Sequence, residues 1–230
     1  AAGRLHEAAA LCRRCVATVQ ERGKWRFFVA GNPSIVLGDV LREWNLLDEA
    51  EAHIHTGIQD NEAWQVAHAY ALGHTTLARL QLARGDYRAA NATLAYQQEL
   101  TQGRTIPPDL AAETRAAQMR VWLAAGDLAA VAQWVAEWSR AAAAAAGFRS
   151  EHDLLTLAHG WLALAHERDA LALLQRMQHD AAAGGRTRRL AEILALIAAA
   201  WQAQGEEHTA LHTLEQALAL SAPMNCIRIF

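Results

Sequence analysis

The sequence predicts an all-α protein built as a solenoid of antiparallel helix pairs, and two observations carry this prediction. Hydrophobic residues make up 53% of the 230 residues, and many of them are Ala, the strongest helix former. Only four prolines and few β-branched residues are present, which leaves little for a sheet. Short turn sequences also recur at a regular spacing along the chain, and a solenoid of this length is ordinary because repeats add along one dimension.

The turns are marked by a residue that tolerates a positive φ, followed in the clearest cases by an acidic residue. Gly85-Asp86 and Gly126-Asp127 are the clearest pair, because Gly can end one helix and Asp can cap the next. Asn45 and Gly205 mark two further turns, and the turn after His166 is weaker. Turns are therefore expected near residues 3, 45, 85, 126, 167 and 205.

This spacing of about 40 residues is typical of helical repeats, and it predicts a tetratricopeptide-like α-α superhelix of about 11 helices. Asn32-Pro33 and Pro107-Pro108 are good helix starts. The helices are expected at 5–22, 33–44 with 48–59, 62–84 with 86–102, 108–125 with 127–146, 150–166 with 169–182, and 187–204 with 206–220.

Small residues recur at two positions relative to the turns, where they would let paired helices approach closely. Seven residues before a turn stand Gly38, Ala78, Met119, Gly160 and Ala198. Five residues after a turn stand Ala8, Ala50, Ala90, Val131, Ala172 and Ala210. We expect one helical-repeat domain over residues 1–230. Since neither end carries a polar capping repeat, we also expect an excised fragment whose exposed ends would allow a homodimer.

Composition argues against several classes of protein. The formal net charge is −3, and no block of Lys and Arg provides a nucleic-acid footprint. No apolar run approaches the roughly 20 residues that cross a membrane, and no secretory leader is present. The three cysteines are too few and too unevenly placed for a disulfide framework, which favours a reducing cytoplasm.

Candidate chemistry is weak in this sequence. Cys12 and Cys15 form a C-x-x-C on a helix, but a structural zinc wants four ligands and no second pair lies nearby. His208 and His212 have the spacing of zinc hydrolases but lack the Glu of H-E-x-x-H. No G-x-S-x-G and no glycine-rich nucleotide loop occurs. We therefore expect no catalytic residue, no metal and no cofactor.

A binding surface is expected on the first helices of the pairs, which line the concave groove of a tetratricopeptide array. Positions six residues before the turns, and seven further back, mix Trp, Arg and carboxylates, a combination that suits a polar or sugar-like ligand. The alternative is a solvated face with no ligand. The candidate residues are Asp39, Arg79, Glu113, Arg120, Trp161 and Glu192.

Two segments resemble a known family. Leu41-Arg42-Glu43-Trp44-Asn45-Leu46-Leu47-Asp48-Glu49-Ala50-Glu51 is similar to the L-x-E-W-N-x-L-D-x-A-E segment of the large ATP-dependent LuxR-type (MalT-like) transcription activators. The end of the chain, from Ala217 to Phe230, is similar to A-L-x-L-A-x-P-x-G-Y-x-R-x-F of the same family, with Asn225-Cys226 in place of Gly-Tyr.

The resemblance implies a helical-repeat sensor between an N-terminal ATPase and a C-terminal DNA-binding helix-turn-helix. The chain itself has neither a phosphate loop nor a basic recognition helix, so no direct contact with nucleic acid is expected. We expect a sensing and assembly module whose partner is a small-molecule inducer or a regulatory protein. The alternative is a stand-alone tetratricopeptide scaffold that binds protein and no small ligand.

Overall fold

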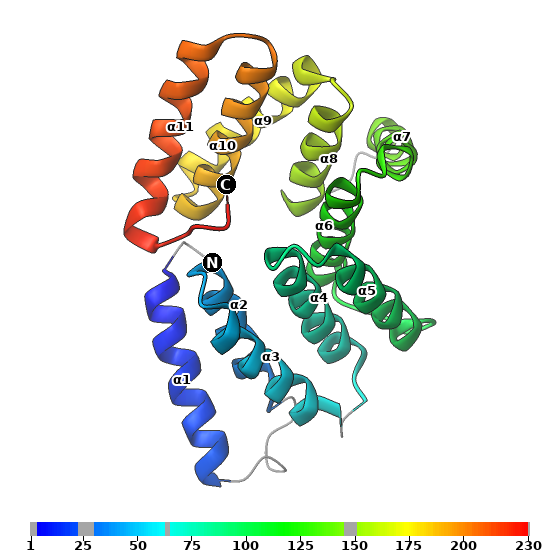
Figure 1. The fold of residues 1–230 in the computed structure, drawn as a ribbon, viewed down its shortest axis with the longest axis vertical. Coiled ribbons are helices and arrows are strands. Elements are labelled where there is room, and N and C mark those ends of the chain that lie inside the picture. Colours follow the sequence, from blue (N-terminus) through cyan, green and yellow to red (C-terminus); the bar gives the residue numbers. More distant parts are fainter. Residues whose placement is uncertain (1–3, 23–29, 63–64, 145–150, 230) are drawn as a thin grey trace. The chain divides into compact units, whose positions relative to one another are not determined.

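The computed structural model describes residues 4–22, 30–62, 65–144 and 151–229. It is all-helical there, as the sequence predicts, with eleven α-helices and one short 3₁₀ helix. The sequence predicts one helical-repeat domain over residues 1–230. The structure divides into two compact units (Figure 1), residues 4–124 (the N-terminal unit) and 125–230 (the C-terminal unit). We describe each unit by itself.

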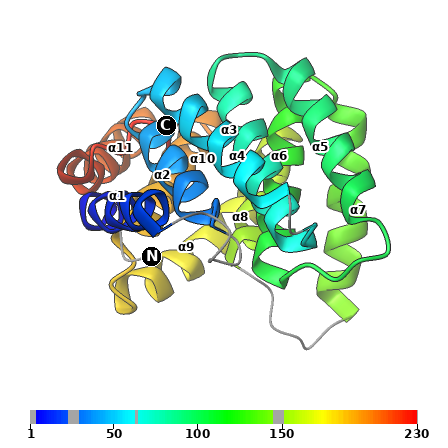
Figure 2. The same cartoon turned by 90° about the horizontal axis from the view of Figure 1, so that it is seen from below.

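The N-terminal unit holds the first six helices, which follow one another in antiparallel pairs. They are α1 (Leu5–Arg22), α2 (Asn32–Glu43), α3 (Leu47–Glu62), α4 (Ala67–Ala83), α5 (Tyr87–Thr101) and α6 (Pro108–Ala125). Each helix from α1 to α4 packs against the next along the chain, and α2 also packs against α4. Figure 2 shows the helices of this unit from below.

The C-terminal unit holds the remaining helices. They are α7 (Leu128–Ala144), α8 (Glu151–Ala163), α9 (Glu167–Ala183), α10 (Thr187–Ala203), α11 (Glu207–Ser221) and the 3₁₀ helix η2 (Ala222–Met224). Each α-helix here also packs against the next, and α8 packs against α10 as α2 does against α4. First helices of consecutive pairs are therefore neighbours in both units. In the described residues no helix is long and apolar enough to span a membrane.

Left-handed residues close the helix pairs at four of the expected places. The backbone φ is 62° at Asn45, 80° at Gly85, 71° at Gly126 and 81° at Gly205. At Gly85 the next amide, that of Asp86, donates to the carbonyl of Gln81 at 2.9 Å, which satisfies a helix-terminal carbonyl. The same bond recurs after Asn45 and after Gly205. The turn expected at residue 3 lies outside the described residues.

The turn expected near residue 167 lies two residues earlier, at Ala165. Ala165 is the left-handed residue, with φ of 58°, and the amide of His166 donates to the Trp161 carbonyl at 2.8 Å. Ala170 is fully buried five residues after this turn, whereas Ala172 is exposed. The expected position of this turn was wrong because the left-handed residue is Ala165, whereas the other turns have Gly or Asn there. Sequence alone gives no reason to place a left-handed residue at an Ala.

The small residues near the turns do allow close approach of paired helices. A Cβ added to Gly38 of α2 would lie 2.5 Å from Cγ1 of Ile54 and 2.9 Å from the Ala50 carbonyl oxygen of α3. Ala50 and Ile54 are themselves fully buried. The backbone of α2 therefore packs almost directly against side chains of α3 at this crossing, as the small residues of the sequence predict.

Several helix boundaries differ from expectation. Helix α4 begins at Ala67 rather than 62, because Gln65 is left-handed with φ of 48° and Val66 is extended. Helix α3 correspondingly continues to Glu62. Asn32 is the first residue of α2 rather than its cap, and its side-chain oxygen accepts a hydrogen bond from Asn61 Nδ2 at 2.8 Å. These boundaries depend on contacts between helices, which outweigh local propensity.

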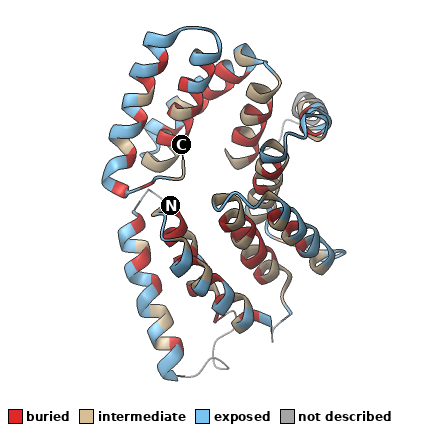
Figure 3. Ribbon diagram, in the orientation of Figure 1, coloured by how far each residue is buried: buried red, intermediate tan, exposed pale blue. Residues whose placement is uncertain are grey.

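The cores consist of small and aliphatic side chains between neighbouring helices. In the N-terminal unit one cluster joins α4, α5 and α6 through Ala78, Ala90, Leu94, Ala117 and Val121. Figure 3 shows the buried residues along the sides of helices that face other helices, with exposed residues on the outer sides. The fold of each unit therefore depends on contacts between successive helices, as expected for repeats that cannot bury their apolar face alone.

Asp86 and Asp127 cap the helices that follow their turns. The Oδ1 of Asp86 accepts from the Ala89 amide at 2.9 Å, and that of Asp127 from the Ala130 amide at 3.0 Å. We expect Asp86→Ala to lower the free energy of unfolding by about 1 kcal/mol, because it leaves a helix-terminal amide without its acceptor. Urea unfolding measures the loss, and Asp86→Asn should restore most of it. An equal loss in both variants would contradict the capping role.

We expect His74 of α4 to make the stability of the N-terminal unit depend on pH. Burial lowers the pKa of His74 below its ordinary value and outweighs the hydrogen bond to the Tyr70 carbonyl and the attraction of Glu62. The unfolded chain therefore binds a proton at a higher pH than the folded chain does. The stability that depends on neutral His74 should be fully present above the unfolded pKa of about 6.5. This contribution should be lost as pH falls from there toward the lower folded pKa.

Urea unfolding at pH values on either side of this range tests the role of His74. The free energy of unfolding should change less with pH for His74→Leu than for the wild type. A control variant at the exposed His208, His208→Gln, should keep the wild-type dependence.

Candidate binding surface on the first helices

Two of the predicted site residues form an ion pair between α2 and α4, the first helices of consecutive pairs. Asp39 of α2 and Arg79 of α4 both lie six residues before their turns, and Arg79 Nη1 lies 3.2 Å from Asp39 Oδ2. The two side chains are 28% and 15% exposed, so each remains partly accessible to solvent. The repeat register alone identified positions that are in contact, because residues at the same level of adjacent helices face one another.

Arg42 and Glu43 of α2 complete a four-residue network with this pair. Arg42 Nε donates to Asp39 Oδ1 at 3.0 Å, and Arg42 Nη2 donates to Glu43 Oε1. Arg79 Nη2 lies 3.6 Å from the same Glu43 oxygen. Two cations and two anions therefore share one site, and their charges balance. We call Asp39, Arg42, Glu43 and Arg79 the first ion network.

The first ion network is deeply placed. The side chains of Arg42 and Glu43 are only 4% and 3% exposed. Burial lowers the pKa of the Arg42 guanidinium, but the attraction of Asp39 and Glu43 and their hydrogen bonds outweigh it, so the pKa lies above its ordinary value. Sequence reasoning missed both residues as site residues. The available signal was their place in the Leu-Arg-Glu-Trp-Asn segment that carries the family resemblance.

A second network joins α8 and α10 in the C-terminal unit. Glu151 contacts Arg186 at 3.2 Å and Arg189 at 3.2 Å, and Arg189 Nη1 lies 2.7 Å from Glu192 Oε2. Arg189 also hydrogen-bonds the ring Nε2 of His152 at 2.9 Å. The side chain of Glu192, a predicted site residue, is 9% exposed, whereas that of Glu151 is 29% exposed. Glu151, Arg186, Arg189 and Glu192 form the second ion network.

Glu113 and Arg120 lie on α6, and both are half-buried. The same helix is tied to α4 by a hydrogen bond between the hydroxyl groups of Thr75 and Thr114 at 2.8 Å. The structure thus brings Asp39 together with Arg79 and places Glu192 in a separate network. Contact of any of these side chains with a ligand stays a prediction.

Trp161 entered the predicted set through a register that was wrong by two residues. With the turn at Ala165, the residue six before the turn is His159 and the residue seven further back is His152. Trp161 lies four residues before the turn, in the same position as Trp122 and Trp201. All three are half-buried, which fits packing between helices. The corrected stripe contains His152, which contacts the second ion network.

The Cys12 thiol is the opposite of an activated thiol. Burial raises the pKa of the Cys12 thiol above its ordinary value, and the nearby Cys15 raises it further. A raised pKa lowers the thiolate fraction and with it the reactivity of the sulfur. Among residues 4–22, 30–62, 65–144 and 151–229, no three His, Cys, Asp or Glu side chains are placed to hold a metal ion.

Antiparallel helix pairs, closed by left-handed turns and joined through their first helices, define a protein of the tetratricopeptide-like repeat class. A family model described as the MalT-like TPR region matches residues 1–230, so the chain belongs to this family. The resemblance carried by the two sequence segments is confirmed.

Two further comparisons place the chain. It is 28% identical over 191 residues to the HTH-type transcriptional regulator MalT of Vibrio campbellii, which corresponds to 81% of this chain and 20% of the relative. The chain thus spans about a fifth of that relative's length. Among solved structures, BtubC (BKLC) from P. vanneervenii aligns with 96% of this chain and 92% of its own, with a TM-score of 0.61 and 14% identity. This likeness supports the fold alone.

Proposed function

We propose that this chain is the sensing and assembly module of an ATP-dependent LuxR-family transcriptional regulator, and that it acts by binding rather than by catalysis. The observation that carries the proposal is the match of the MalT-like TPR family over the whole chain. The relative that it resembles is a transcriptional regulator about five times longer than the matched part, which leaves room for flanking domains.

The two ion networks are the parts of the surface that a polar effector would engage. Each joins first helices of consecutive repeats, and each keeps partly exposed charged groups, Asp39 and Arg79 in one and Glu151 and Arg186 in the other. A ligand with carboxyl or hydroxyl groups would exchange hydrogen bonds with these side chains. Because the networks hold neighbouring repeats together, such a ligand would bias how those repeats pack.

Binding can switch the regulator only through different affinities for two states. A shift from 1:99 to 99:1 requires about 5.5 kcal/mol of differential affinity, which is more than one exposed ion pair supplies. The proposal therefore needs an effector that contacts several side chains at once. Asp39 and Arg79, with their buried partners Arg42 and Glu43, provide such a group within one unit.

A thermal-shift panel of sugars and organic acids tests this proposal. A true effector at 100 times its Kd should stabilise the protein by about 2.7 kcal/mol, a clear rise in Tm. Arg79→Gln should reduce that rise in Tm. The control Arg88→Gln changes an exposed Arg on α5, the second helix of its pair, and should leave the rise unchanged. Equal responses in both variants would remove the first ion network from the binding surface.

Assays of the longer regulator distinguish a sensing module from a stand-alone scaffold. In a regulator that carries the flanking domains, an effector found by the panel should change ATP turnover or DNA binding. Capture of a protein partner with no such effect, and no effector in the panel, would favour the stand-alone scaffold. Turnover of any substrate by the isolated chain would contradict the proposal that it is not an enzyme.

A further inference from the structure

Two exposed leucines form an apolar stripe along α11 in the C-terminal unit. Leu211 and Leu218 lie seven residues apart, so they share one face of the helix. They are 55% and 47% exposed, and Figure 3 shows much of α11 in the exposed colour. Single exposed leucines are ordinary on a protein surface, but two on one helix face form an apolar patch. We call these two residues the α11 stripe.

Both leucines occupy fixed positions in the helix pair, six and thirteen residues after its left-handed residue, Gly205. The first of these positions contacts the next first helix in two earlier pairs. In α3 it is Glu51, which pairs at 3.0 Å with Arg84 at the end of α4. In α5 it is Asn91, which accepts a hydrogen bond from Gln118 of α6 at 3.2 Å. This position therefore faces forward along the array.

Large apolar residues at these positions are shielded in α3 and α9. Ile58 of α3 is at the second position and is half-buried, and a Cβ added to Gly73 of α4 would lie 2.7 Å from its Cγ1. Leu171 of α9 is at the first position and is only 6% exposed, in a helix that packs against α10. Leu211 is the same residue at the same position in the same unit, but it is exposed.

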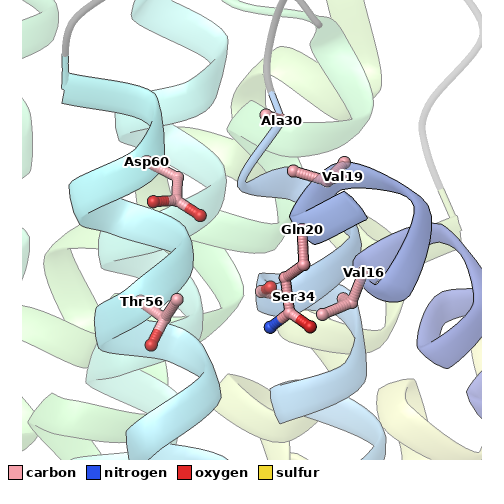
Figure 4. Close-up of a pocket in the computed structure, with 7 residues that line it drawn as sticks. All are labelled: Val16, Val19, Gln20, Ala30, Ser34, Thr56 and Asp60. Carbon is pink, nitrogen blue, oxygen red and sulfur yellow. The ribbon is translucent and has the colours of Figure 1, made fainter. Parts of the chain in front are cut away.

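The joint between α1 and the pair that follows shows how closely such a face is covered. Figure 4 shows Val16 and Val19 of α1 on the side that meets α2 and α3. The gap left between the three helices has a volume of about 30 Å³, which is room for water and not for a side chain. Among the described residues of the C-terminal unit, none covers Leu211 and Leu218 to that extent.

We propose that the α11 stripe is the docking face for one further first helix, supplied by the same polypeptide in the longer regulator. The same two positions join successive pairs of one chain in this structure, which favours the same polypeptide over a separate protein as the source. The occupant would present Gly or Ala to Leu218, as α4 presents Gly73 to Ile58. This inference rests on the proposed function, because it takes the chain as one module of a longer protein.

The charges of α11 define the occupant further. Glu207 and Glu215 are both exposed, and the helix contains no Lys or Arg. In α3, Asp48 and Glu51 hold Arg84 at the C-terminal end of α4. The occupant should therefore run antiparallel to α11 and carry Arg or Lys in its last turn, where the helix dipole also favours a cation.

Maleimide labelling of a Leu218→Cys variant, read by mass spectrometry of peptides, tests this assignment. The variant should label rapidly in the 230-residue chain and about tenfold or more slowly in the longer regulator, because a covered thiol reacts only after local opening. Thr209→Cys, at an exposed position on another side of α11, is the matched control and should label equally fast in both proteins. Equal rates for Leu218→Cys in both would overturn the proposal.

Other occupants of the α11 stripe give different results in the same assay. Slower labelling of the 230-residue chain at higher protein concentration would assign the stripe to a second copy. Protection in the longer regulator only after a separate protein is added would assign it to that protein. Either result overturns the proposal. Protection in a regulator that responds to no effector would leave this inference standing and remove the sensing role instead.

A peptide with the sequence of residues 66–84 tests the kind of helix that the stripe accepts, because it contains α4 with Gly73 and Arg84. Fluorescence anisotropy should show saturable binding to the 230-residue chain. Leu211→Gln combined with Leu218→Gln should weaken binding about tenfold or more, through the loss of apolar burial. Leu128→Gln, at an exposed leucine of α7, should keep it. Absence of binding, or equal binding by the double variant, would overturn the match between the stripe and a first helix.

Discussion

Arg42→Ala is expected to lower the free energy of unfolding by about 3–5 kcal/mol, the range for breaking a buried ion pair by removing one partner. The Arg42 side chain is 4% exposed and contacts both Asp39 and Glu43. Its removal leaves the buried Glu43 and the partly buried Asp39 with Arg79 as their remaining cation in the network. The cost is the desolvation of carboxylates that lose a partner, added to the packing lost with a buried side chain.

Urea unfolding followed by circular dichroism measures this loss, and hydrogen exchange of peptides from α2 and α4 locates it in the N-terminal unit. Arg84→Ala is the matched control. Arg84 also pairs with two carboxylates, those of Asp48 and Glu51, but its side chain is 35% exposed. Surface pairs contribute about 0–1 kcal/mol, so this variant should change little. Similar losses in the two variants would mean that burial does not decide the strength of the network.

Gly57→Ala is expected to destabilise the N-terminal unit even though Ala is the better helix former. Gly57 lies inside α3, where Ala would normally gain about 0.5–1 kcal/mol. A Cβ at this position would lie 2.6 Å from the Gly31 carbonyl oxygen, 2.6 Å from Ile35 Cγ1 and 3.0 Å from the Ile35 backbone nitrogen. Two of these atoms belong to the backbone and cannot rotate away. Overpacking of this kind costs about 1–3 kcal/mol or more, so the clash outweighs the gain in propensity.

Gly73→Ala is the matched comparison for Gly57→Ala, because its added Cβ would crowd side chains and not backbone. A Cβ at Gly73 in α4 would meet only side-chain atoms, Cγ1 of Ile58 at 2.7 Å and two others at 3.5 Å. Those side chains can shift, and the gain in helix propensity offsets part of the cost, so a smaller loss is expected. Urea unfolding of the two variants compares them directly. A Gly57→Ala protein as stable as the wild type would show that α2 and α3 can separate without cost.

Local sequence determined much of this fold. Gly85, Gly126 and Gly205 mark turns because glycine adopts a positive φ without steric cost, and Asp86 and Asp127 follow where a helix needs an acceptor. The period of the turns then predicts helix pairs stacked in order. It also places Asp39 and Arg79 at one register position in adjacent repeats, and the structure shows that the two side chains form an ion pair.

Tertiary contacts decided the rest. Ala165 has a left-handed backbone conformation that its side chain does not favour, so the turn lies two residues earlier than the position near 167 that the sequence predicts. Trp161 is therefore no longer six residues before its turn, the position that defined the predicted binding surface. In the N-terminal unit the packing of helices buries Arg42 and Glu43, although their charges alone would place them in solvent. Turn chemistry is local and can be read along the chain. Burial and the pairing of charges depend on which helices come together, because a charge leaves water only where the folded structure supplies its counterion.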